Sequence, residues 1–211
     1  MKDAVRELIY VPIVHTQADM GSLQPAFKRE ILRKHRASDW QNLTQAVEKF
    51  WEGLRKRIKG LQLDYQRTYI YQDGLPVCGK ELQIVTDLVG QGSPNHRLVL
   101  WLVKKGADLV GTESPQLLLE EYELIRKIFS APQGDQRETA VASYRKRAAD
   151  LLVERDDYIR RRINLTLPEG GTGILFIGLT HKVDEGLPGD IHISYLIHNL
   201  HFKRTGRIER L

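Results

Sequence analysis

Short apolar runs that end in a polar residue recur along the chain. They span residues 8–14, 107–111 and 173–179, and they are followed by His15, Glu113 and His181. Runs of this length are typical of buried strands of an α/β sheet, although periodicity alone does not distinguish them from a buried helix segment. Because open α/β sheets bind ligands at the carboxyl ends of their strands, we expect a site where these runs end.

Two further patterns complete the predicted sheet. Residues 63–71 are rich in tyrosine and end in the turn signal Gln72-Asp73-Gly74, and residues 190–196 alternate weakly between apolar and polar positions. The first strand, predicted over residues 6–14, contains Pro12. Proline cannot donate to a ladder, so we expect this strand at an edge of the sheet or with a bulge.

Apolar residues at spacings of three and four predict helices between these strands. A wide face of this kind begins after Ser38, an expected N-cap, and ends at Gly60. The other predicted helices cover residues 25–36, 81–89, 96–105, 115–129 and 136–165. Strands alternating with helices predict an α/β fold with a central, at least partly parallel β-sheet flanked by helices and carrying a long helical insertion. We expect a single domain over residues 1–211, with helical elaborations at about 25–60 and 115–166 and a peripheral basic tail at 199–211.

The composition favours a globular protein that works without a membrane partner. Of 211 residues, 41% are hydrophobic and 28% charged, and no apolar run is long enough to span a bilayer. The first seven residues are charged and lack the apolar centre of a signal peptide. The single cysteine, Cys78, cannot form an intrachain disulfide, so we expect a cytoplasmic protein.

The net charge of +5 comes with basic runs at residues 55–59, 145–147 and 160–162. These runs fall on predicted helices with acidic neighbours or apolar faces, so solvated helix surfaces are favoured over a nucleic-acid interface. The wide apolar face of the helix over residues 39–59 is either core or a dimer surface, which leaves a homo-oligomer open.

The residues at the predicted strand ends have the chemistry of a catalytic site. His15, Glu113 and His181 supply two imidazoles and a carboxylate, which together suit a divalent metal such as Zn²⁺, Mn²⁺ or Co²⁺ with open positions. Asp73, after a fourth strand, adds a carboxylate. Without a metal, the same groups could act as general acid and base. The alternative for each residue alone is a turn residue that bonds to backbone.

Arg155 is a further candidate because it lies on the apolar face of the long helix, four residues from both Leu151 and Ile159. A guanidinium directed at a core needs a partner, and Glu113, Asp156 or a substrate anion could provide it. The alternative is that Arg155 extends along the helix to solvent. Two weaker candidates are Asp19, in the loop after His15, and Arg97, an anion contact at a helix start.

Taken in order, four short motifs make the chain resemble the TraB/PrgY–TIKI–ChaN–erythromycin-esterase-like superfamily. They read Pro12-Ile13-Val14-His15, with proline in place of the usual glycine, a strand ending in Glu113, Glu154-Arg155-Asp156, and Gly178-Leu179-Thr180-His181. The resemblance implies an α/β fold with both histidines, Glu113 and Arg155 at one site. It also implies varied activities, since members look like metal-dependent peptidases, hydrolases, haem-binding proteins or regulators of pheromone signalling.

Three functions follow in order of preference. The first is a metal-dependent hydrolase, peptidase-like or esterase-like, that acts on a small molecule or peptide through His15, Glu113 and His181, with Arg155 orienting Glu113 or an anionic intermediate. The second is a ligand-binding or regulatory protein that keeps the site without turnover. The third is a basic module that binds nucleic acid through its helical faces, and its binding would weaken steeply with salt.

Overall fold

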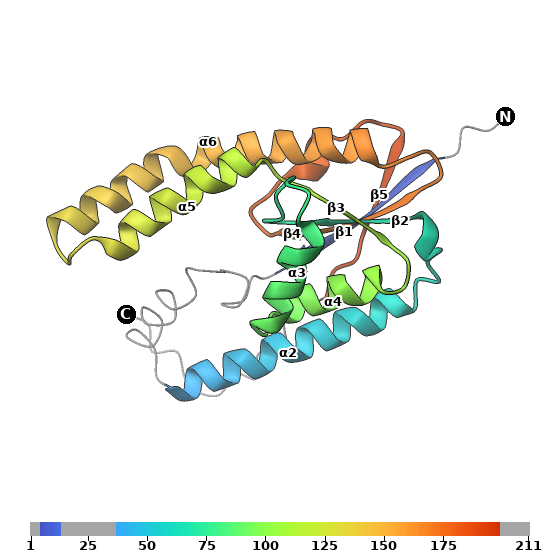
Figure 1. Cartoon of the computed structure of the whole chain (residues 1–211), viewed down its shortest axis with the longest axis horizontal. Coiled ribbons are helices and arrows are strands. Elements are labelled where there is room, and N and C mark those ends of the chain that lie inside the picture. The colour runs from blue at the N-terminus through green and yellow to red at the C-terminus, as the bar shows by residue number, and fades with distance from the viewer. Residues whose placement is uncertain (1–4, 14–36, 199–211) are drawn as a thin grey trace, which may run out of the picture.

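A sheet of five parallel strands lies at the centre of the computed structural model, which describes residues 5–13 and 37–198 (Figure 1). The strands are β1 (Arg6–Ile13), β2 (Thr68–Gln72), β3 (Asp108–Val110), β4 (Thr172–Gly178) and β5 (Ile191–Tyr195), in the order β3-β2-β4-β1-β5. Every pair of neighbours is parallel. The predicted α/β class is therefore confirmed. The helix expected over residues 25–36 and the tail over 199–211 lie outside the described residues.

The prediction that β1 is an edge strand or carries a bulge is wrong. β1 pairs in unbroken register with β4 on one side and β5 on the other. The carbonyl of Tyr10 accepts from the backbone N–H of Leu196. Alternate residues of β1, including Pro12, therefore direct their backbone polar groups toward β5. The pairing with β5 ends at Tyr10. Pro12 therefore faces the side on which no partner strand continues, and its missing N–H costs no ladder hydrogen bond.

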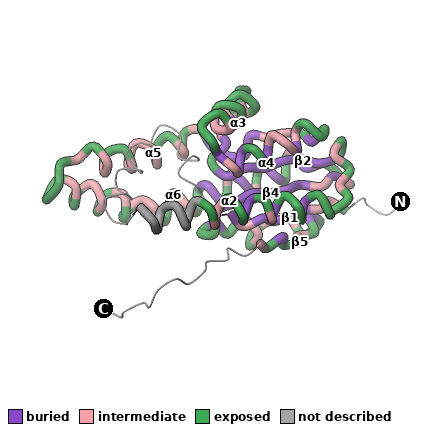
Figure 2. The backbone as a smooth tube through the Cα atoms, turned by 90° about the horizontal axis from the view of Figure 1, so that it is seen from below, coloured by how far each residue is buried: buried purple, intermediate pink, exposed green. Residues whose placement is uncertain are grey.

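Helices cover both faces of the sheet, and two hydrophobic clusters mark the layers. On one face α2 (Ala37–Lys59), α3 (Glu81–Gly90) and α4 (Pro94–Val103) pack on side chains such as Val11 and Phe176. On the other face Ile159 and Ile163 of α6 (Asp135–Thr166) pack on Leu175. The residues that the two helix layers bury lie mainly on the strands (Figure 2). The apolar face of α2 is thus core, since Phe50, Trp51, Leu54 and Ile58 are buried.

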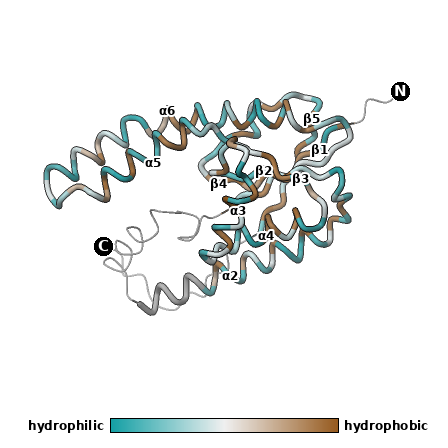
Figure 3. Tube along the Cα trace, in the orientation of Figure 1, coloured by the Kyte–Doolittle hydropathy of each residue, from teal (hydrophilic) through white to brown (hydrophobic). Residues whose placement is uncertain are grey.

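The predicted helical insertion is an antiparallel hairpin of α5 (Pro115–Ser130) and α6. It extends well beyond the sheet, and polar and apolar residues alternate along both of its helices (Figures 1 and 3). α5 contains no buried residue, and the buried residues of α6 begin at Leu151. Only the second half of α6 therefore belongs to the layered body. None of the described helices is both long enough and apolar enough to cross a membrane.

Local hydrogen bonds explain where two elements depart from the predicted boundaries. The strand expected from residue 63 begins only at Thr68, because the Asp64 carboxylate accepts from the N–H of Gln66 and favours a 3₁₀ turn over Tyr65–Arg67. The helix expected from residue 96 begins at Pro94, because the Ser93 hydroxyl accepts from the N–H of His96 and caps the helix. Neither change moves the carboxyl edge of the sheet.

Candidate functional site

The carboxyl edge of the sheet brings three polar residues together directly after β2, β3 and β4. They are Asp73, Glu113 and His181. The backbone N–H of Asp73 donates to the carbonyl of Phe176 at 2.9 Å, which extends the pairing of β2 with β4 by one residue. The N–H of Glu113 donates to the carbonyl of Leu75 at 3.0 Å. Backbone pairing therefore fixes the positions of these side chains.

Arg155, on the buried face of α6, holds the carboxylates in place. Its Nε and Nη2 atoms donate to Oε2 and Oε1 of Glu113 at 2.6 and 2.7 Å, a bidentate pair. Nη2 also donates to Oδ1 of Asp73 at 2.9 Å, and Nη1 donates to Oε2 of Glu121 at 2.6 Å. Burial alone would lower the pKa of Arg155, but these carboxylates outweigh burial and raise it. Arg155 is therefore a permanent cation with three acidic partners.

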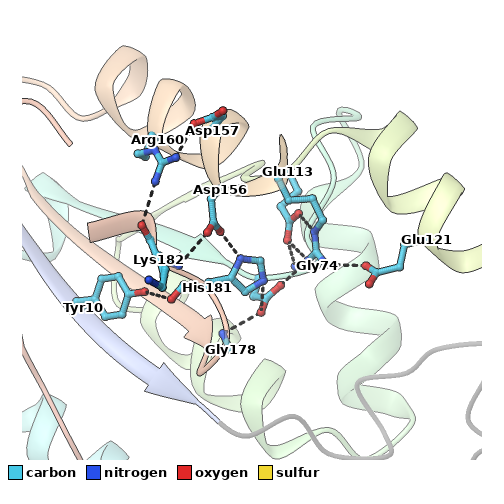
Figure 4. A network of polar contacts seen from close by, with 12 residues as sticks. Tyr10, Gly74, Glu113, Glu121, Asp156, Asp157, Arg160, Gly178, His181 and Lys182 are labelled. Carbon is cyan, nitrogen blue, oxygen red and sulfur yellow. Dashed lines mark hydrogen bonds and ion pairs between the residues drawn. The ribbon is translucent and has the colours of Figure 1, made fainter. Parts of the chain in front are cut away.

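Glu113 is completely buried, with 0% of its surface exposed. Its Oε1 atom accepts from the N–H of Gly74 at 2.7 Å in addition to the bond from Arg155 (Figure 4). Burial and the nearby Asp73 raise the pKa of Glu113, whereas Arg155 opposes that change. Since both oxygens accept from charged or backbone donors, the ionised form is the one that this arrangement stabilises. Both carboxylate oxygens of Glu113 contact the guanidinium of Arg155.

His181 is held by the residue that follows Arg155. Its Nδ1 atom lies 2.5 Å from Oδ1 of Asp156, and Oδ2 of Asp156 accepts from the N–H of Lys182 at 2.9 Å (Figure 4). Both side chains are buried. Burial alone would lower the pKa of His181, but the hydrogen bond to Asp156 and the charge of Asp73 outweigh burial and raise the pKa. The carboxylate of Asp156 thus fixes the imidazole orientation and leaves Nε2, the other ring nitrogen, on the side of Asp73.

Asp73 connects the two halves of the network. Its Oδ1 atom accepts from Arg155, and its Oδ2 atom accepts from the N–H of Gly178 at 2.9 Å and lies 3.5 Å from Nε2 of His181. One carboxylate therefore contacts the guanidinium, the end of β4 and the imidazole. The loop that carries His181 is also bonded to α6 through Arg160, which donates to the carbonyl of Lys182 at 2.9 Å (Figure 4).

A cavity of about 510 Å³ opens above this network. Its polar lining includes Asp73, Glu121, Tyr144, Arg155 and His181. Aliphatic side chains complete the lining, among them Ile13, Leu88, Leu118, Ile125 and Leu179. Apolar walls around a few convergent polar groups are typical of small-molecule and active-site pockets. The imidazole and the guanidinium are therefore accessible to a ligand although each side chain is mostly buried.

The structure brings together five of the residues that the sequence singles out: Asp73, Glu113, Arg155, Asp156 and His181. Of the two partners expected for Arg155, Glu113 is bonded to it, whereas Asp156 binds His181. Arg97 is not part of the cluster. It is exposed on α4, where it pairs with Glu48 at 3.3 Å. His15 and Asp19 lie outside the described residues.

Two site residues were missed from the sequence, Glu121 and Tyr144. Glu121 reads as an ordinary acidic residue of an amphipathic helix, and Tyr144 as one of the apolar residues of the long helix. The only signal for Glu121 was indirect. A buried guanidinium has five N–H donors, so Arg155 needed more acceptors than one carboxylate supplies.

The predicted metal ligands fit this arrangement only in part. Among residues 5–13 and 37–198, no group of three or more His, Cys, Asp and Glu is placed to hold a metal ion. Both oxygens of Glu113 already accept from Arg155. Nε2 of His181 and Oδ2 of Asp73 are 3.5 Å apart, close to the roughly 3.4 Å expected between two ligands of tetrahedral zinc. A metal at this edge would therefore use His181 and Asp73 rather than Glu113.

Comparison of the chain with protein-family models, with curated proteins and with solved structures finds no match. The resemblance to the TraB/PrgY–TIKI–ChaN–erythromycin-esterase-like superfamily therefore stays a prediction.

Proposed function

We propose that the protein is a hydrolase whose reaction takes place in the cavity at the carboxyl ends of β2, β3 and β4. The observation that carries this proposal is the buried hydrogen bond of 2.5 Å between Asp156 and His181 at the cavity lining. An imidazole oriented through Nδ1 by a carboxylate is a common general acid and base, because Nε2 is then free to exchange a proton with substrate or water.

In this proposal neutral His181 removes a proton from a water molecule through Nε2 as the water oxygen bonds to the substrate carbonyl carbon. The resulting imidazolium is stabilised by Asp156 and Asp73, the two carboxylates that contact the ring nitrogens. The same proton then passes from Nε2 to the leaving group as its bond to carbon breaks. The two steps consume one water and return His181 to its neutral form.

Arg155 and Glu113 support the site rather than act on the substrate. Arg155 fixes Asp73, and Asp73 fixes the N–H of Gly178 at the start of the loop that carries His181. When bound, a divalent metal would polarise the carbonyl and lower the pKa of a coordinated water. Nε2 of His181 cannot both hold a metal and take a proton, so metal dependence with His181 and Asp73 as ligands is an alternative to His181 as the base, and the chelator in the screen distinguishes the two.

A ligand-binding protein without turnover is the second candidate, and the many ion pairs of Arg155 favour it. Each nitrogen of the guanidinium already donates to a carboxylate. Of its five N–H donors only one, on Nη1, is then left for a developing oxyanion unless a bond to a carboxylate breaks. A network of this kind could keep a binding cavity in shape without catalysis.

The basic nucleic-acid module stays the least favoured function. Arg147 pairs with Glu120 at 2.7 Å and with Glu154 at 2.6 Å, and Arg160 pairs with Asp157 at 2.5 Å. Basic residues that are paired with acidic residues of α5 or α6 leave less positive charge for phosphates, which supports the solvated-surface interpretation.

The test is a hydrolase screen with ester, amide and phosphoester substrates, with chelator and with added Zn²⁺, Mn²⁺ or Co²⁺. We expect turnover that His181→Ala reduces by roughly 10²–10⁴-fold. The matched control is His192→Ala, on the exposed side of β5, which should retain the wild-type rate. Absence of turnover under every condition, or equal rates for the two variants, would reject the hydrolase. Calorimetric titration with each metal separately tests whether His181→Ala abolishes metal binding.

A further inference from the structure

One face of α5 forms a wall of the cavity. Leu118, Glu121 and Ile125 all line it, and their spacing of three and four residues places them in a row on the same side of the helix. Leu88 of α3 adds a further aliphatic group to the cavity. All three aliphatic side chains remain partly exposed. The wall therefore combines one carboxylate with apolar surface that a ligand would remove from water.

Glu121 keeps hydrogen-bonding capacity on this wall. Its Oε2 atom accepts from Arg155 at 2.6 Å, and its Oε1 atom accepts a long hydrogen bond of 3.4 Å from the Tyr144 hydroxyl. A carboxylate has about four acceptor positions. The side chain is 22% exposed, unlike Glu113 at 0%. Glu121 is thus the carboxylate of the network that is most open to a ligand donor.

The balance of charge decides which donor fits. The described residues of the network include four carboxylates, on Asp73, Glu113, Glu121 and Asp156, against the guanidinium of Arg155 and the imidazole of His181. The network is negative even when His181 is protonated. An anionic ligand meets this excess charge and an arginine with four of its five N–H donors already bonded to carboxylates. A cation meets an attractive field that is little screened in a cavity.

We propose that this cavity binds a ligand in which an ammonium group is joined to an aliphatic chain. The ammonium group donates to Glu121, and the chain packs against Leu118, Ile125 and Leu88. The inference rests on the proposed function in that it names the substrate class of the same site, but it concerns binding and requires no turnover.

The test compares n-hexylammonium with n-hexanol and n-hexanoate, three probes with one chain and different head groups. Binding to the full chain is measured by calorimetry, and thermal shift gives a second measurement. We expect hexylammonium to bind about tenfold or more tightly than hexanol, the range for a hydrogen bond to a charged group, and hexanoate to bind more weakly than both. Because charges in a cavity are screened little, the affinity of hexylammonium should change little with added salt.

Glu121→Gln should abolish the preference for the ammonium probe over hexanol. The matched control is Glu123→Gln on the same helix, where Glu123 pairs with exposed Arg126, and it should keep the preference. Leu118→Ala should weaken hexylammonium binding severalfold, whereas Leu119→Ala, at a residue that is 60% exposed, should not. In the wild type, each methylene removed from the probe should cost about threefold to fourfold if it is buried.

The outcomes separate this inference from the hydrolase proposal. Selective binding of hexylammonium without any turnover would reject the hydrolase and retain the ligand class. Turnover combined with equal binding of the three probes would reject the ligand class and retain the hydrolase. If Glu121→Gln fails to fold, the chain-length series and Leu118→Ala decide, because the inference is also rejected if affinity is independent of chain length and of Leu118.

Discussion

Nδ1 of His181 lies 2.5 Å from Oδ1 of Asp156, a residue on a different element and 25 positions earlier in the chain. The second oxygen of Asp156 binds the backbone of Lys182, so one carboxylate fixes both the imidazole and the loop that carries it. The orientation of His181 therefore depends on the placement of α6. A change at Asp156 should therefore measurably alter the acid–base behaviour of His181.

The proposed reaction should have a defined pH dependence. His181 acts as a base only when it is neutral, and its pKa is raised above the usual 6.5 by Asp156 and Asp73 despite its burial. The rate should therefore increase with pH and level off above that raised pKa. Asp156→Asn removes the hydrogen-bonded charge, so it should move the inflection to lower pH and reduce the plateau rate by roughly 10²–10⁴-fold. A pH–rate profile that falls with pH, or an unmoved inflection in the variant, would contradict His181 as the base.

Folding stability should depend on the same imidazole. Because the pKa of His181 is raised in the folded state, its protonation stabilises the fold fully below the unfolded pKa of about 6.5, and the contribution disappears as pH rises through the folded pKa. The free energy of unfolding of wild type minus that of His181→Gln should be larger at about pH 6 than at about pH 9. Urea denaturation at both values measures it, with His192→Gln as the control on the exposed side of β5. An equal difference at the two values would count against the raised pKa.

Removal of Arg155 should destabilise the protein strongly, because Glu113 would keep a buried charge without its partner. We expect Arg155→Met to cost about 3–5 kcal/mol in the free energy of unfolding. The same change should cost less in a Glu113→Gln background, where the buried charge is absent. The control is Arg126→Met, which removes an exposed ion pair with Glu123 and should have little effect. Additive costs in the double variant would show that the Arg155–Glu113 pair is not coupled.

Gly111 permits the close approach of the chain segments that place Glu113. A Cβ atom on Gly111 would lie 2.8 Å from the Cα atom of Val77 and 3.1 Å from the carbonyl oxygen of Pro76. Gly111→Ala should therefore cost about 1–3 kcal/mol in stability. Gly90→Ala, which meets no atom within 4 Å at the end of α3, should instead stabilise by about 0.4–1 kcal/mol. Thermal unfolding of both variants measures the contrast, and similar melting temperatures would show that the chain around Gly111 adjusts freely.

Much of the fold was predictable because strongly apolar runs and capped helices carry local signals. The strand at residues 172–178 and the hairpin of α5 and α6 fall within one or two residues of the sequence pattern. The position of β1 was not predictable from Pro12, since the effect of a missing N–H depends on where the neighbouring strand ends. That information lies in the pairing with β5, far away in the sequence.

The location of the site was predictable from the sequence, but the hydrogen bonds within it were not. Strand ends indicated Asp73, Glu113 and His181, and the helical spacing around Arg155 indicated that it faces the core. The sequence could not show that Glu113 binds Arg155 whereas Asp156 binds His181, because adjacent positions on α6 differ only in the direction of their side chains. Glu121 contributes through the packing of α5 against α6, which no local pattern encodes.

Three consecutive residues of α6 carry alternating charge, and each has a partner of opposite sign in a different direction. Glu154 pairs with Arg147, Arg155 with Glu113, and Asp156 with His181. Sliding the helix by one residue in either direction would set an acidic residue, Glu154 or Asp156, against the buried Glu113. The buried pairs of Arg155 and Asp156 with other elements therefore favour one rotation of α6 about its axis. α6 has 32 residues, and its first half projects from the sheet. The same bonds that shape the cavity therefore also fix the position of this helix.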